Sequence, residues 1–102
     1  AYEHIYLNTH WYSYQCLKGM RRGDCGTDEA SYWKIREDVY VVTWREVLID
    51  LAAAFVYDMR ARRSTGCAWG TPGGLPEPRH ILTGASFEKL NAADYPADIE
   101  LV

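Results

Sequence analysis

Three residues in the first half of the chain have side chains that could transfer protons or hold a polar molecule: Glu46, His4 and Tyr6. A carboxyl group buried beside Trp44 and Tyr40 would have a raised pKa and could act as a general acid near neutral pH. An imidazole can act as a base or orient a ligand, and a phenol can donate a hydrogen bond. We therefore predict Glu46, His4 and Tyr6 as candidate catalytic residues for proton transfer on a small organic molecule.

Each of these residues also has a structural interpretation. Glu46 could be a carboxylate at the rim of the fold, paired with Arg45 or Lys34 on a neighbouring strand. His4 could be a satisfied structural group on an aromatic face. The sequence leaves both alternatives open.

The opening stretch YEHIYLN alternates aromatic, polar and apolar side chains. In a strand, Tyr2, His4 and Tyr6 would share one face, and Ile5 and Leu7 would share the other. If the first face points inward, it suits a cavity for a polar, partly aromatic ligand. If the second face points inward, the phenols belong to an interface.

Further aromatic side chains are candidates for holding the ligand. We assign Tyr2, Tyr14, Tyr40 and Trp44 to ligand binding by this reasoning. Tyr12, Tyr14 and Cys16 share one strand face, so the two tyrosines either extend the lining or form a cross-strand aromatic ladder.

Short strands separated by turn residues must position these side chains. Six strands are expected, at about 2–8, 11–20, 29–36, 39–47, 49–58 and 62–69. The run LIDLAAAF is also compatible with a helical turn, because alanine favours helix. The Gly/Pro-rich stretch GTPGGLPEPRH predicts a loop, residues 86–93 a short helix, and Ile99, Leu101 and Val102 a further strand.

This order of elements predicts an all-β fold, an antiparallel meander of about six to eight strands. The strands would close into a barrel or half-barrel, since closure removes exposed edges. With 102 residues, the chain is predicted to form one domain, residues 1–102, with a β core at about 1–70 and a loop, helix and tail at 71–102.

Composition excludes several classes of function. The net charge of −3 argues against nucleic-acid binding, and no apolar run reaches the length of about 20 residues that spans a membrane. Cys16, Cys25 and Cys67 match no metal-binding spacing, and their odd number favours free thiols in a reducing, cytoplasmic compartment. Neither a metal nor another cofactor is predicted. The absence of an initiator Met fits an excised domain or a processed product.

The motifs YEHIYLN, the CLKG strand end and K-I-x-x-D-x-Y-x-x-x-W-R-E at residues 34–46 resemble the C-terminal domain of the MoaF family, the molybdenum cofactor biosynthesis protein F-like proteins. The resemblance covers residues 1 to about 70 and implies a calycin-like antiparallel barrel. It also implies a second, related domain ahead of this one. No molybdopterin or phosphate-binding motif accompanies it.

The segment KIREDVYVVTWRE also resembles K-L-x-x-G-x-Y-x-V-x-W-x-E of the phenolic acid decarboxylases, which are calycin-type barrels. This resemblance implies that Glu46 serves proton transfer in a cavity. It places Tyr6 at the second of two substrate-holding tyrosines and His4 at the first.

Three functions remain open from the sequence. The domain could bind a small, partly apolar or aromatic organic molecule without chemistry. It could be a cofactor-free lyase, isomerase or cyclase that uses Glu46. It could also be an assembly domain that pairs with a second copy or with a partner domain.

Overall fold

The described part of the chain folds into one antiparallel sheet of seven strands, in which each strand pairs with its neighbours in sequence. A computed structural model describes residues 1–71 and 76–92. The strands are β1 (Tyr2–Tyr6), β2 (Trp11–Cys16), β3 (Cys25–Arg36), β4 (Val39–Glu46), β5 (Leu51–Asp58), β6 (Arg63–Gly70) and β7 (Arg79–Ser86). A single 3-10 turn, η1 (Val47–Ile49), joins β4 to β5. The predicted all-β antiparallel half-barrel is confirmed.

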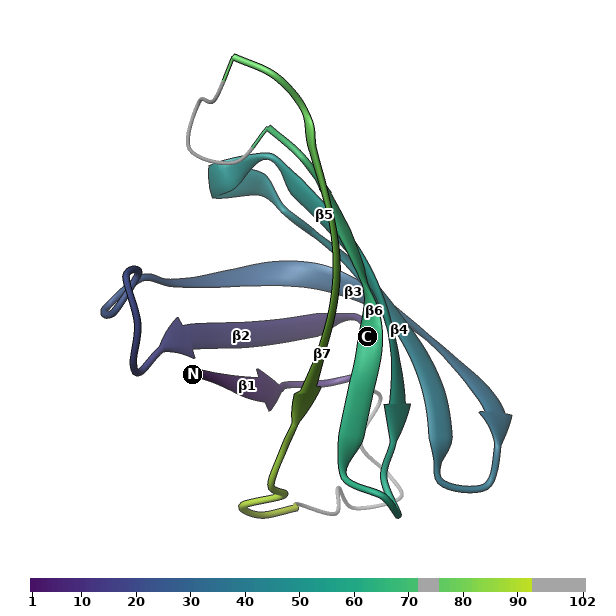
Figure 1. Cartoon of the computed structure of the whole chain (residues 1–102). Coiled ribbons are helices and arrows are strands. Elements are labelled where there is room, and N and C mark those ends of the chain that lie inside the picture. The colour runs from purple at the N-terminus through teal and green to yellow at the C-terminus, as the bar shows by residue number, and fades with distance from the viewer. Residues whose placement is uncertain (72–75, 93–102) are drawn as a thin grey trace.

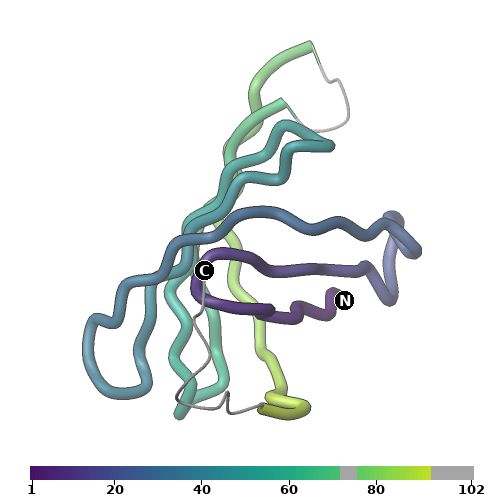
Figure 2. The backbone as a smooth tube through the Cα atoms, turned by 180° about the vertical axis from the view of Figure 1, so that it is seen from behind, coloured from purple at the N-terminus to yellow at the C-terminus, as the bar shows by residue number. Residues whose placement is uncertain are grey.

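The sheet curls at β3, a long strand that belongs to both halves of the sheet. The first part of this 12-residue strand pairs with β2 and the second part pairs with β4. In Figure 1, β1 and β2 run across the direction of β4–β6, and Figure 2 shows the same arrangement from behind. The inner faces of the two halves therefore meet, and β1 and β7 form the two ends of the sheet.

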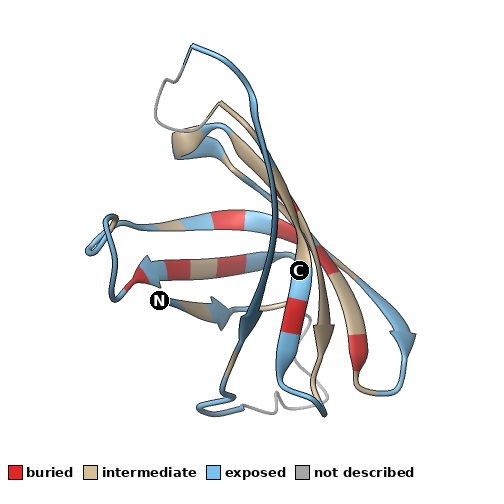
Figure 3. Cartoon of the chain, in the orientation of Figure 1, coloured by how far each residue is buried: buried red, intermediate tan, exposed pale blue. Residues whose placement is uncertain are grey.

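The core lies on this inner face and is largely aromatic. Tyr12, Tyr14, Ala30 and Val42 are buried, and four partly buried aromatic side chains pack against them: Tyr32, Tyr40, Trp44 and Tyr57. Figure 3 shows the buried positions concentrated on β2 to β4, whereas β7 is exposed along its whole length. The core thus consists mainly of tyrosine side chains together with Trp44, Ala30 and Val42, and one end of the sheet is left uncovered.

Several predicted boundaries are wrong. β1 ends at Tyr6 and β2 at Cys16, rather than at about residues 8 and 20. β3 begins at Cys25 rather than at about residue 29, because this segment pairs with β2, and the hydroxyls of Ser13 and Thr27 form a hydrogen bond of 2.7 Å across the two strands. β5 begins at Leu51 rather than at residue 49, because Val47–Ile49 form η1. The first two residues of LIDLAAAF therefore lie in a helical turn, and its last five, residues 51–55, lie in the strand.

The predicted helix at 86–93 is wrong for residues 86–92. Ser86 ends β7, and no helix follows in 87–92; residue 93 lies outside the described residues. The backbone continues the ladder instead, since the Phe87 N–H donates to the Arg62 carbonyl at 3.0 Å and the Phe87 ring packs 5.6 Å from that of Tyr57. The predicted strand at 99–102 also lies outside the described residues.

The seventh strand lies mostly between the predicted loop, which ends at residue 80, and the predicted helix at 86–93, where no strand was predicted. Its partner β6 aligns with it over all eight residues, from Arg63 opposite Ser86 to Gly70 opposite Arg79. RHILTGAS therefore forms a strand because it pairs with β6, although its sequence alone favours a strand only weakly.

Candidate functional site

An aromatic surface from five strands covers the inside of the half-barrel. We call it the aromatic inner face. It comprises the residues Tyr2, His4, Tyr6, Tyr12, Tyr14, Tyr32, Tyr40, Trp44, Phe55 and Tyr57. The ring centroids of His4 lie 5.5 Å from Tyr12 and 5.7 Å from Trp44, so the Tyr2, His4 and Tyr6 face of β1 points inward. Of the two orientations left open for the first strand, the structure has this one.

Glu46 lies at the end of β4 with its side chain half-buried at one end of this face. Its Oε1 accepts a hydrogen bond from Trp44 Nε1 at 3.3 Å, whereas its Oε2 is buried without a partner among the described residues. Burial raises the pKa of this carboxyl, and the Trp44 N–H and the charge of Arg21 offset part of the rise. The environment therefore favours a protonated carboxyl more than water does.

The interpretation of Glu46 as a paired rim carboxylate is wrong. Arg45 pairs with Asp50 at 3.2 Å and Lys34 pairs with Glu37 at 2.9 Å. Both cations that were candidates for pairing with Glu46 are thus engaged elsewhere.

His4 connects Glu46 to Tyr6 through a series of contacts. The His4 ring meets the Trp44 ring edge-on, and Trp44 in turn donates to Glu46. On its other side, His4 Nδ1 lies 3.3 Å from Tyr6 Oη, within hydrogen-bonding distance. Burial lowers the pKa of His4, which favours the neutral imidazole. The three predicted catalytic residues therefore share one surface. His4 contacts Tyr6 directly and reaches Glu46 only through Trp44 among the contacts described.

A group of phenols lies on the Tyr6 side of the face. The ring of Tyr6 is 5.9 Å from that of Tyr32, and burial together with the neighbouring Tyr57 hydroxyl raises the pKa of Tyr6. The Oη atoms of Tyr32 and Tyr12 are buried and have no hydrogen-bond partner among the described residues. Tyr32 and Tyr57 could not be singled out from the sequence, because alternation alone does not show which side of each strand faces inward.

The four predicted ligand-binding residues occupy different parts of the face. Trp44 stacks on Phe55 at 5.3 Å and forms its floor. Tyr14 is 4% exposed and stacks on Tyr12 of the same strand at 6.0 Å, a contact within β2 rather than across strands. Tyr2 is half-exposed at the end of the sheet. Tyr40 lines a separate hollow of about 290 Å³ together with Phe87 and Lys89. Only Trp44 contacts both Glu46 and His4.

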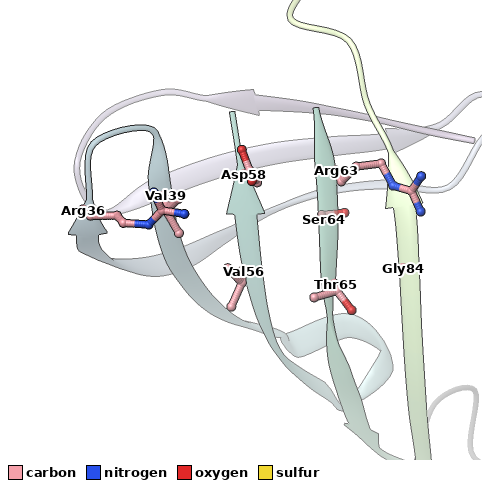
Figure 4. A pocket seen from close by; sticks show the side chains of 8 residues that line it. All are labelled: Arg36, Val39, Val56, Asp58, Arg63, Ser64, Thr65 and Gly84. Carbon is pink, nitrogen blue, oxygen red and sulfur yellow. The ribbon is translucent and has the colours of Figure 1, made fainter. Parts of the chain in front are cut away.

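Another hollow lies on the outer face of the sheet. It measures about 400 Å³ and is lined by Arg36, Val39, Val56, Asp58, Arg63, Ser64, Thr65 and Gly84 (Figure 4). It is open to solvent, and none of its residues belongs to the aromatic inner face. The aromatic inner face is the stronger candidate for a ligand site, because it contains buried polar atoms without a hydrogen-bond partner among the described residues. The polar groups of an open hollow can instead bind water.

The remaining chemistry-bearing side chains do not gather. Within residues 1–71 and 76–92, no three His, Cys, Asp or Glu side chains lie close enough together to hold a metal ion. All three cysteines are free thiols; Cys16 is buried and Cys25 is exposed. No helix in the described part of the chain is long and apolar enough to cross a membrane.

The fold and this surface define an open antiparallel half-barrel with an aromatic interior. Residues 1–93 match the family model of the MoaF C-terminal domain, and the chain belongs to that family. It is 38% identical over 91 residues to protein MoaF of Klebsiella aerogenes, an alignment that covers 88% of this chain. The chain spans 35% of the length of that relative.

The fold is also similar to that of a solved structure. It is the "Crystal Structure of a putative beta-lactamase from Burkholderia vietnamiensis", with a TM-score of 0.56 and 18% sequence identity. The match covers 76% of this chain and 73% of the other. At this identity the likeness concerns the fold alone.

Proposed function

We propose that this domain binds a small, partly apolar or aromatic organic molecule on the aromatic inner face. One observation carries the proposal: three buried polar atoms on this face, Tyr12 Oη, Tyr32 Oη and Glu46 Oε2, have no partner among the described residues. Leaving a buried polar group unpaired costs about 1–3 kcal/mol, so most such groups in folded proteins are paired. A ligand that pairs them would recover this free energy.

The geometry favours a ligand with a flat apolar body and polar groups at its ends. The stacked rings of Trp44 and Phe55, with the edge of His4, offer a surface for an aromatic or planar molecule. The Tyr12 and Tyr32 hydroxyls can donate to a carbonyl, ether or carboxylate oxygen. Glu46 Oε2 accepts from a ligand O–H or N–H when the carboxyl is ionised and can donate when it is protonated.

An enzymatic function is the second candidate, supported by the raised pKa of Glu46 beside an unpartnered Oε2. In this alternative the domain is a cofactor-free lyase, isomerase or cyclase. Glu46 would exchange a proton with the substrate, and neutral His4 with Tyr6 would hold it in place. A protonated carboxyl near neutral pH is the property that such a general acid requires.

Ligand-observed NMR against a panel of aromatic and heteroaromatic compounds that carry hydroxyl, amide or carboxylate groups tests the proposal. We expect binders whose affinity falls about tenfold in Tyr32→Phe, the loss of one hydrogen bond to an otherwise unpaired group. Thr43→Val on the outer side of β4 is the matched control and should bind like the wild type. Binders that are unaffected by Tyr32→Phe, Tyr12→Phe and Glu46→Gln alike would place the site elsewhere.

Turnover of a bound compound separates the two functions. An enzyme should lose turnover in Glu46→Gln while it keeps ligand affinity and fold, whereas a binding domain shows no turnover to lose. We also propose a reducing, cytoplasmic compartment, because exposed Cys25 and the other two thiols are free.

A further inference from the structure

Strand β7 ends the sheet with one side unpaired among the described strands. It pairs with β6 alone, and all eight of its residues are exposed. Natural proteins usually protect such an edge with charged residues, proline, a bulge or a covering segment. From His80 to Ser86, β7 contains no Asp, Glu, Lys, Arg or Pro, and Ile81 and Leu82 are 49% and 77% exposed. An unprotected edge of this length is a template for another strand.

The hydrogen-bond pattern shows which backbone groups are free. The Phe87 N–H donates to the Arg62 carbonyl, and Thr65 Oγ1 donates to the Thr83 carbonyl at 3.4 Å. In an antiparallel ladder, residues alternate between facing the partner strand and facing away. The odd-numbered residues of β7 therefore bond to β6, and His80, Leu82, Gly84 and Ser86 point their N–H and C=O groups toward the open edge.

We propose that β7 pairs with β7 of a second copy of this chain, antiparallel about a two-fold axis at Thr83. This register places Thr83 opposite its own copy, Leu82 opposite Gly84, and Ile81 opposite Ala85. The four outward-facing residues of each strand would then exchange about eight backbone hydrogen bonds. The large side chains meet small ones on both sides of the sheet, so the strand is complementary to itself.

Charge favours this partner over other edges. The segment of β7 that would pair, from His80 to Ser86, contains no Asp, Glu, Lys or Arg, so two copies meet without repulsion between like charges. The opposite edge, β1, is shorter at five residues and includes Glu3, which a β1–β1 pairing would bring close to its copy. A two-fold, isologous contact also closes on itself and does not propagate into fibres.

The side chains of β7 are available for such a contact. All eight residues of the strand are exposed, including Ile81 and Leu82, so the pairing can add side-chain contacts to the backbone hydrogen bonds. The pairing would also extend the outer face across both copies, since Trp69 and His80 are neighbours on it.

Light scattering coupled to size exclusion, run over a range of protein concentrations, measures the assembly. We expect a dimer for the wild type. Thr83→Lys and Thr83→Glu should each be monomeric, because two like charges would sit directly opposite at the axis. An equimolar mixture of the two variants should restore a dimer with one chain of each kind.

Two further variants separate the backbone from the side chain. Leu82→Pro removes an outward N–H without removing a β6–β7 bond and should abolish the dimer while thermal unfolding and circular dichroism stay close to the wild type. Leu82→Ala keeps the N–H and should dimerise with weakened affinity. A monomeric wild type, or a dimer that survives Thr83→Lys, Thr83→Glu and Leu82→Pro, would overturn the proposal.

Discussion

Tyr12→Phe should stabilise the free protein, although Tyr12 is the most buried large side chain in the described chain. The Tyr12 side chain is 1% exposed, and its ring packs against His4, Tyr14 and Trp44. The substitution keeps this ring and removes only the hydroxyl, whose oxygen has no hydrogen-bond partner among the described residues. The native state then no longer contains a desolvated, unpaired polar atom.

The magnitude follows from the cost of burying an unpaired polar group. That cost is about 1–3 kcal/mol. Removing the oxygen also leaves a small void, which reduces the stabilisation that the substitution would otherwise give. We therefore expect the free energy of unfolding to rise by about 1 kcal/mol. For a domain of this size, this corresponds to an increase of roughly 4–8 °C in the melting temperature.

Thermal and urea denaturation of the free protein measure this change, with Tyr40→Phe as the control. Tyr40 is partly buried, and its hydroxyl is not among the buried unpaired atoms, so its removal should change stability little. If Tyr12→Phe lowers the free energy of unfolding by about 1 kcal/mol, the hydroxyl has a partner in the free protein, and the main support for a ligand site is lost. When a ligand is bound, the order of stability should reverse: the ligand should stabilise the wild type more than it stabilises Tyr12→Phe.

Three other perturbations test separate parts of the structure. Because burial raises the pKa of Glu46 in the folded state, its contribution to stability is fully present below the unfolded pKa of 4.5 and is lost as pH rises through the folded pKa. Melting temperatures measured against pH should show this loss in the wild type and not in Glu46→Gln, and parallel curves would contradict it. Gly66→Ala should cost about 3 kcal/mol in chemical denaturation, since the added methyl would lie 2.7 Å from Phe55 Cα on the next strand; an unchanged midpoint would show that the strands can separate there. A thiol reagent should label exposed Cys25 in seconds and buried Cys16 only on unfolding, and equal rates would mean that β2 opens readily.

Part of the candidate site could be predicted because its residue types are unusual at their positions. Glu46 was recognisable as a carboxyl beside Trp44 in an alternating strand, and the structure keeps these two residues in contact. Tyr32 could not be recognised in the same way. It is followed by Trp33, an aromatic side chain on the opposite face, and only the pairing of β3 with β4 decides which ring points inward.

The sequence by itself determined the class of fold. Alternating side chains and closely spaced turns specify short antiparallel strands, and such local signals need no knowledge of distant residues. Tertiary structure decided the rest. The assignment of RHILTGAS to β7, the extension of β3 back to Cys25, and the choice of the inward face of β1 all depend on partner strands. Burial and register arise only when the whole sheet is assembled, because a strand has no inside until another surface covers it.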